Sequence, residues 1–135
     1  MRFAHISDTH IRNYKYQKEY REVFEKLYET LRKEKVDYII HTGDIAHTKT
    51  QMSPEFVELA SEFLANLADI AGTFVLLGNH DGNLKNSARQ DALTPIVQNL
   101  NHPDLHLFKG YDSVELSNNF KLHALCVFDD ENNWN

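Results

Sequence analysis

Three short apolar segments, each followed at once by a cluster of polar residues, restrict the fold of this 135-residue chain more than any other feature. Segments 2–7, 36–41 and 73–77 are rich in β-branched, apolar and aromatic residues, which predicts three strands. Between them, segment 15–35 and the segment after Ser53 carry apolar residues at three- and four-residue spacing, as amphipathic helices do. The order strand, helix, strand, helix, strand predicts an α/β fold with a mostly parallel sheet.

The polar clusters after these strands are expected to meet in space. In a parallel sheet, the loops beyond the carboxyl ends of the strands gather at one edge. The residues concerned follow the first, second and third segment in turn: Asp8 and His10; Asp44; and Asn79, His80 and Asp81. We therefore expect one site that is built from three distant parts of the chain.

The second half of the chain gives weaker signals. Ser53, Pro54 and Glu55 have the pattern of a helix start, with a capping residue, a proline and an acid. Segment 88–100 is expected to form a helix that Pro95 interrupts. Segments 105–108, 114–116 and 120–128 predict strands joined by turns, and the polar segment 129–135 predicts neither helix nor strand.

Composition narrows the classes of function. Hydrophobic residues make up 41% and charged residues 25% of the chain, as in a globular protein. The net charge of -6 gives no general attraction to nucleic acid, so a phosphate-bearing substrate needs a local cation. The lone Cys126 cannot form an internal disulfide, and no uncharged run approaches the ~18 residues of a membrane span. We therefore expect a soluble protein with no membrane partner, located in the cytoplasm, or in the host cytoplasm if a phage encodes it.

The polar clusters have the chemistry of a catalytic metal site. Carboxylate, imidazole and amide groups are ligands for Mn, Fe or Zn, and the lack of a cysteine cluster argues against structural zinc. Asp8 and His10 are two residues apart, so both can face one ion, and Asp44 can bridge to a second ion through its two oxygens. Two ions ~3.5–4 Å apart can activate water and stabilise a phosphoryl centre. This pattern indicates a phosphoesterase.

The motifs Asp8-x-His10, Gly43-Asp44 and Gly78-Asn79-His80-Asp81 resemble, in order, the first three signature motifs of the calcineurin-like metallophosphoesterases. The resemblance implies that Asp8 and His10 bind one metal ion, Asp44 bridges, and Asn79 binds a second. It implies two divalent ions, with Mn2+ preferred over Mg2+, Fe2+ or Zn2+.

The resemblance also implies catalytic roles for neighbouring residues. His80 would donate a proton to the leaving group or stabilise charge on the scissile phosphate, and His47 would lie beside the substrate. Asp81 has two interpretations, as the carboxylate partner of the His80 imidazole or as a cap of the local turn.

Within the superfamily, segments 5–10 and 41–47 look most like the DNA-repair nuclease branch of SbcD and Mre-type enzymes, including a phage recombination endonuclease subunit. The protein-phosphatase branch would show Gly-Asp-x-Val-Asp-Arg-Gly at the second motif, and Ile45, Ala46 and His47 follow Gly43-Asp44 here instead. The resemblance therefore implies metal-dependent hydrolysis of DNA in recombination and repair, with DNA and an SbcC-like ATPase subunit as partners. A small-molecule phosphodiesterase or phosphatase of the same superfamily is the alternative.

Downstream motifs of the family are missing. The family pattern continues with a further histidine and a Gly-His-x-His pair, and none of the later histidines matches it. We therefore expect residues 1–135 to be the N-terminal portion of the nuclease domain, a partial α/β/β/α sandwich whose second sheet is largely missing. The second metal site would be incomplete, and the chain would be a non-catalytic fragment or would assemble with a complementary C-terminal half or as a homodimer.

Other residues near the motifs have a structural and a functional interpretation. Tyrosines near the start of the first helix could stack on bases, but tyrosine at helical spacing is more often packing: Tyr14, Tyr16 and Tyr20. Three cations are expected to be solvated rather than bound to a DNA backbone: Lys49, Lys85 and Arg89. The remaining histidines are expected to be structural or solvated: His5, His41, His102, His106 and His123.

Overall fold

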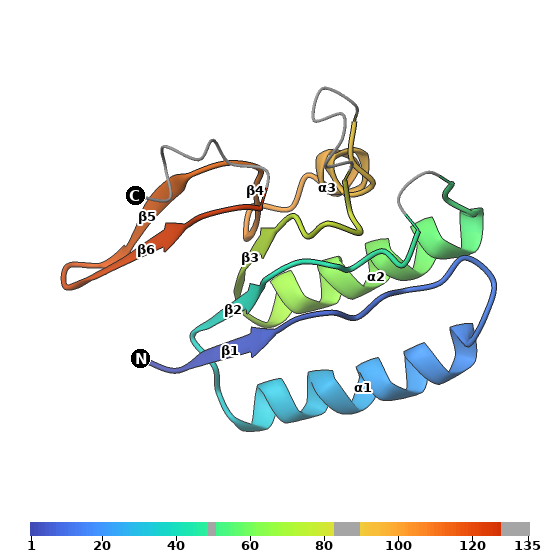
Figure 1. Ribbon diagram of the computed structural model, residues 1–135. Helices are drawn as coiled ribbons and strands as arrows, with labels where there is room; N and C mark the ends of the chain where they lie inside the picture. Colours follow the sequence, from blue (N-terminus) through green and yellow to red (C-terminus); the bar gives the residue numbers. More distant parts are fainter. Residues whose placement is uncertain (49–50, 83–89, 128–135) are drawn as a thin grey trace.

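A four-stranded parallel sheet forms the centre of the molecule (Figure 1). The computed structural model describes residues 1–48, 51–82 and 90–127. The strand order is β1-β2-β3-β4, and each strand runs parallel to its neighbour. The strands are β1 (Phe3–Ile6), β2 (Tyr38–His41), β3 (Gly72–Leu76) and β4 (Leu105–Phe108). All four therefore end at the same edge of the sheet.

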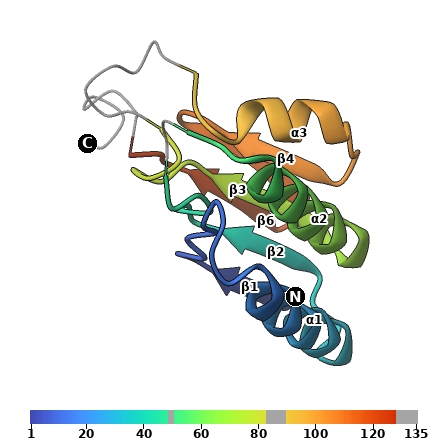
Figure 2. The ribbon, with the colours of Figure 1, turned by 90° about the vertical axis from the view of Figure 1, so that its right-hand side faces the viewer.

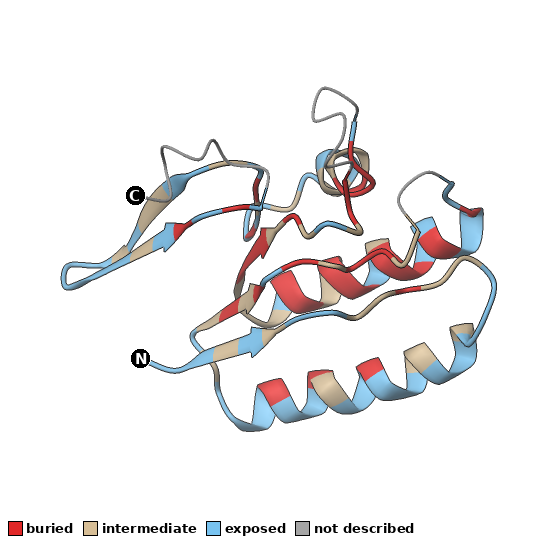
Figure 3. Ribbon diagram, in the orientation of Figure 1, coloured by how far each residue is buried: buried red, intermediate tan, exposed pale blue. Residues whose placement is uncertain are grey.

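Helices cover one face of this sheet (Figure 2). They are α1 (Gln17–Lys33), α2 (Pro54–Ile70) and α3 (Thr94–Leu100). The apolar stripe of α1 packs on α2, where the Phe24 and Phe63 rings stack with centroids 4.2 Å apart. The side of α2 toward the sheet is buried and the outer side of α1 is exposed (Figure 3). The core between helices and sheet holds the site loops in a fixed position.

The helix α2 begins where the sequence predicts. The Ser53 side chain accepts a hydrogen bond from the Phe56 amide at 3.0 Å, and Pro54 occupies the first turn. Ser53 also donates to the Asn13 carbonyl at 2.6 Å, which ties the loop before α1 to the start of α2.

A hairpin lies on the other face of the sheet. The strands β5 (Asp112–Ser117) and β6 (Phe120–Ala124) pair antiparallel across the predicted Asn118–Asn119 turn. A small apolar cluster around Phe74 and Phe108 joins this hairpin to β3 and β4. The architecture is a mixed α/β fold with one parallel sheet flanked by helices and a second small sheet, which confirms the expected fold class.

Two sequence predictions were wrong in detail. Pro95 lies in the first turn of α3 and does not interrupt the helix, because a proline there loses no hydrogen bond. The predicted strand 120–128 ends at Ala124. The predicted helix begins only at Thr94, so residues 90–93 are not helical, and residues 88–89 and 128 lie outside the described residues. Among the described helices, none is long and apolar enough to cross a membrane.

Candidate metal centre

The loops that follow β1 and β2 run side by side at the carboxyl edge of the sheet. Backbone amides of the first loop donate to carbonyls of the second: Asp8 to Gly43 at 3.1 Å, and His10 to Asp44 at 2.9 Å. A parallel bridge between Ile11 and Ala46 continues the contact. The two loops therefore extend the sheet by a narrow ribbon, and their polar side chains share one surface.

Two glycines bring the third loop against this ribbon. A Cβ on Gly43 would lie 2.5 Å from the Gly78 nitrogen and 2.7 Å from its Cα, and Gly43 has a φ of +111°. A Cβ on Gly78 would in turn overlap Asp44. The contact permits the His80 amide to donate to Asp44 Oδ1 at 2.8 Å. The close approach of Asp44 and His80 thus requires glycine on both loops.

Asp8, His10 and Asp44 form one potential ligand group. Their ligand atoms all lie within 4.8 Å of one another, and His10 Nε2 is 3.5 Å from Asp8 Oδ1 and 3.9 Å from Asp44 Oδ2. Ser7 donates a hydrogen bond to Asp8, and this bond is the largest effect that lowers the pKa of the Asp8 carboxyl. Desolvation acts in the opposite direction, and His10 lowers the pKa further. Asp8 is therefore held as a carboxylate, the form that binds a cation.

The backbone of this group is unusual. Asp8, His10 and Asp44 have φ values of 56°, 45° and 58°, in the left-handed region that residues with a side chain rarely adopt. Such conformations cluster at functional sites, where the surrounding hydrogen bonds hold them.

Asn79 extends the group toward the third loop. One terminal atom of its side-chain amide lies 3.1 and 3.2 Å from the two carboxylate oxygens of Asp44. This atom is the amide nitrogen, because it faces only acceptors, and it donates to the Asp44 carboxylate. Asn79 therefore lies against Asp44, and its role as a metal ligand stays a prediction.

A second group contains three imidazoles. The ligand nitrogens of His10, His47 and His80 lie within 4.8 Å of one another, and the His10 and His80 rings meet edge to face at 4.7 Å. His80 Nδ1 lies 3.0 Å from the His47 carbonyl oxygen. A hydrogen bond there places the proton on Nδ1 and leaves Nε2 as a free acceptor. Burial lowers the pKa of His47, as do the neighbouring charges of Arg12, His10 and His80.

Asp81 lies beneath the site rather than in it, so the prediction of a catalytic role as the partner of the His80 ring needs correction. Its carboxylate is buried and accepts backbone hydrogen bonds from Asp44 at 2.7 Å, Ala46 at 2.8 Å and Gly78 at 2.9 Å. Burial raises the pKa of Asp81 to about 6, although the three amides act in the opposite direction. The cap interpretation fits these contacts, because Asp81 joins the second loop to the third.

Each of the other five histidines makes a contact within the fold. His41 is fully buried, and its Nδ1 accepts a hydrogen bond from the Gly43 amide at 3.1 Å. The other four each contact a polar side chain or a ring: His5 with Thr42, His102 with Asp69, His106 with Phe74, and His123 with Tyr111. Lys49, Lys85 and Arg89 lie outside the described residues.

Two contacts of the site were missed from the sequence. Tyr20 donates from its hydroxyl to the His10 carbonyl at 2.6 Å, and Ser7 donates to Asp8. Ser7 could have been identified from the sequence, because it is adjacent to the predicted ligand Asp8. Nothing in the spacing indicated that Tyr20, ten residues from His10, reaches back to it.

The calcineurin-like phosphoesterase family model matches residues 1–134. The chain belongs to this family. The chain is also 45% identical over 131 residues to an uncharacterized protein of Acanthamoeba polyphaga mimivirus. That match covers 94% of the chain and 10% of the mimivirus protein, so the chain spans about a tenth of the length of this relative. Membership of the family supports a metal-binding hydrolase.

The residues of this site fit a divalent metal ion. Two carboxylates, an imidazole and an amide converge from three loops, and the remaining two imidazoles are close by. This donor set of oxygen and imidazole nitrogen suits Mn, Fe or Zn and contains no thiolate.

Proposed function

We propose that the chain carries the metal-binding half-site of a phosphodiesterase that hydrolyses DNA. The observation that supports this most is the convergence of Asp8, His10, Asp44 and Asn79 from three strand ends onto one surface. A hollow of about 560 Å³ beside them is lined by Asp8, Asp44 and Asn79, and also by apolar Leu125 and Val127. A phosphodiester can enter this hollow next to the ligands.

The side chains of the site have two roles in the proposed hydrolysis, metal binding and proton transfer. Asp8, His10, Asp44 and Asn79 would hold divalent cations, which when bound would supply charge for the phosphate and a nucleophilic water at neutral pH. The Asp44 carboxylate is fixed on one side by the His80 amide, which limits its rotation. His80, with Nδ1 oriented by the His47 carbonyl, has its Nε2 available to hold a proton for the leaving oxygen.

The preference for DNA rests on the second motif. Its Ile45-Ala46-His47 sequence differs from the protein-phosphatase pattern, and it places the His47 ring 6.1 Å from the His80 ring. We propose manganese as the metal, action in recombination and repair, and a cytoplasmic location. We further propose an SbcC-like ATPase or a complementary C-terminal half as partner, with homodimer formation as the alternative.

Manganese binding measured by calorimetry, together with hydrolysis of bis-p-nitrophenyl phosphate and of linear DNA, tests the proposal. We expect Asp44→Asn to weaken manganese binding about tenfold or more, because it removes the central carboxylate. Asp112→Asn, an exposed change on β5, serves as the control and should leave binding unaltered.

The substrates separate the alternatives. Cleavage of the dye ester but not of DNA would replace the nuclease by a small-molecule phosphodiesterase. Activity that appears only on addition of a C-terminal half would show that the site is shared between two polypeptides. Equal manganese binding by the wild type and Asp44→Asn would refute the metal site itself.

A further inference from the structure

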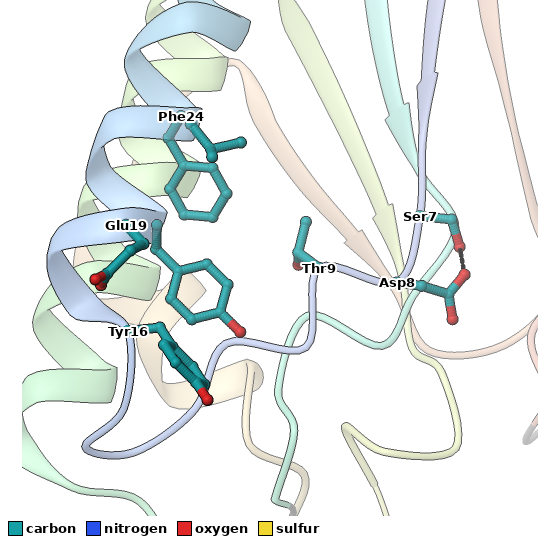
Figure 4. A pocket seen from close by; sticks show the side chains of 8 residues that line it. Ser7, Asp8, Thr9, Tyr16, Glu19 and Phe24 are labelled. Carbon is teal, nitrogen blue, oxygen red and sulfur yellow. Dashed lines mark hydrogen bonds between the residues drawn. The ribbon is translucent and has the colours of Figure 1, made fainter.

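A second pocket lies beside Asp8, on the side of the loop that faces α1 (Figure 4). It has a volume of about 360 Å³, at the lower end of the roughly 300–1,000 Å³ typical of small-ligand sites. Its lining residues come from the end of β1 and from the first turns of α1: Ser7, Asp8, Thr9, Tyr16, Glu19, Tyr20, Val23 and Phe24. Half of these residues are aromatic or apolar, and apolar atoms make up most of the surface of the pocket.

The pocket has a rigid floor and an exposed rim. Phe24 is 5% exposed and stacks on Phe63 in the core, so the floor cannot easily collapse. On the rim, Tyr16 and Val23 are 58% and 61% exposed, which is unusual for large apolar side chains. Neither residue belongs to the buried stripe of α1, which contains Phe24, Tyr28 and Leu31.

Two features connect the pocket to the candidate metal centre. Tyr20, in its wall, donates to the backbone carbonyl of His10. Ser7 and Asp8 line both this pocket and the hollow that contains Asp44 and Asn79. Figure 4 shows the Asp8 carboxylate beside Ser7 and turned away from the aromatic side chains. A ligand can therefore contact the aromatic pocket and the metal ligands from either side of one short loop.

Tyr16 adopts a backbone conformation that folding alone does not favour. It precedes α1 with a φ of 64° and a ψ of 24°, and its side chain makes no capping hydrogen bond. Its carbonyl accepts from the Tyr20 amide at 2.8 Å, which fixes the first turn. A left-handed tyrosine at a pocket rim is a strained feature of the kind that marks binding sites.

The charge of the pocket determines what can enter. Its ionisable lining residues, among those that the structure describes, include Asp8 and Glu19 but no lysine or arginine. The pocket therefore offers no cation to a phosphate, whereas a neutral flat ring is attracted by the aromatic walls.

We infer that this pocket binds the nucleobase of the substrate nucleotide, with Tyr16 stacking on the base while the phosphate lies at the metal centre. The inference deepens the proposed function and rests on it only for the position of the phosphate. Tyr16 thus contributes substrate affinity and does not hold metal.

Adenosine, which has no phosphate, tests the pocket independently of the metal centre. We expect a titration followed by 1H–15N correlation spectra to shift the amides of residues 7–9 and 16–24. Tyr16→Ala should weaken adenosine binding about tenfold, the loss typical of one stacked base, and Tyr16→Phe should retain most of it. Tyr14→Ala is the matched control, because Tyr14 is 74% exposed and does not line the pocket.

A second arm tests the link to the metal centre. Adenosine 5′-monophosphate with Mg2+ should bind more tightly than adenosine, and Asp44→Asn should remove this gain but leave adenosine binding intact. If the wild type binds adenosine 5′-monophosphate with Mg2+ no more tightly than adenosine, while adenosine binding still depends on Tyr16, the metal site is refuted but the pocket is not. Equal adenosine binding by the wild type and Tyr16→Ala, or shifts outside these segments, would overturn the inference. So would concentration-dependent dimerisation that Tyr16→Ala abolishes, since another copy of the chain would then cover the pocket.

Discussion

The contribution of His41 to the stability of the domain should fall as pH drops below neutrality, because this histidine must remain neutral in the fold. His41 is 0% exposed, and burial lowers its pKa from 6.5 to about 4, with His5 lowering it and Asp8 raising it as smaller effects. The hydrogen bonding of His41 also favours its neutral form. The His41 Nδ1 accepts the Gly43 amide at 3.1 Å, and a proton on this nitrogen would abolish that bond.

The sign and size of the effect follow from these two pKa values. Between pH 6.5 and 4 the unfolded chain takes up a proton that the folded chain does not, so the stability is complete above pH 6.5 and is lost as pH falls toward 4. The difference of about 2.5 between the two pKa values corresponds to about 3 kcal/mol, of which about 2 kcal/mol is lost by pH 5.

Urea unfolding between pH 7.5 and 4.5, in the presence of a chelator, measures this loss. His41→Asn keeps an acceptor for the Gly43 amide but cannot take up the proton, so its free energy of unfolding should vary less with pH than that of the wild type. The difference between the two proteins is the relevant quantity, because Asp81 titrates in the same range with the opposite sign. The exposed His106→Asn is the control and should follow the wild type. Parallel pH curves for the wild type and His41→Asn would refute the reasoning.

Three further substitutions, with Gly72→Ala as a control for the first, test by urea unfolding how the loops and helix starts around the site are held. Gly43→Ala should lower the free energy of unfolding by about 2 kcal/mol or more, because residue 43 has a positive φ and the new Cβ would overlap the third loop. Gly72→Ala should lower it by less than about 1 kcal/mol, because the new Cβ would meet only the side chain of Tyr38. Asp81→Ala should cost about 3 kcal/mol, because three backbone amides lose their acceptor; a loss below 1 kcal/mol would show that water replaces it. Ser53→Ala should cost about 1 kcal/mol through loss of the α2 cap, and an unchanged midpoint would contradict that role.

The order of elements and the site's location could be predicted because each depends on local patterns. Apolar periodicity marked the strands and α2, and parallel topology alone brought Asp8, Asp44 and His80 to one edge. Pro95 was misjudged because proline ends a helix in its interior but begins one in its first turn, and only the boundary decides which applies.

Contacts at long range could not be predicted in the same way. The sequence is equally compatible with Asp81 as the partner of the His80 ring and as a cap of the local turn. Only the fold shows that its carboxylate is buried and accepts hydrogen bonds from amides of the second loop. The link from Tyr20 to His10 depends on the angle between α1 and the end of β1, which no spacing encodes.

The left-handed backbone at Asp8, His10 and Asp44 bears on how such a chain can change by mutation. Each of these positions costs on the order of 1 kcal/mol of backbone strain relative to glycine, so glycine there would relieve this strain while removing a ligand. At Asp44 the substitution would also remove the acceptor of the His80 amide. A lineage that no longer used the site would therefore be free of the selection that keeps three strained ligands together in one sequence.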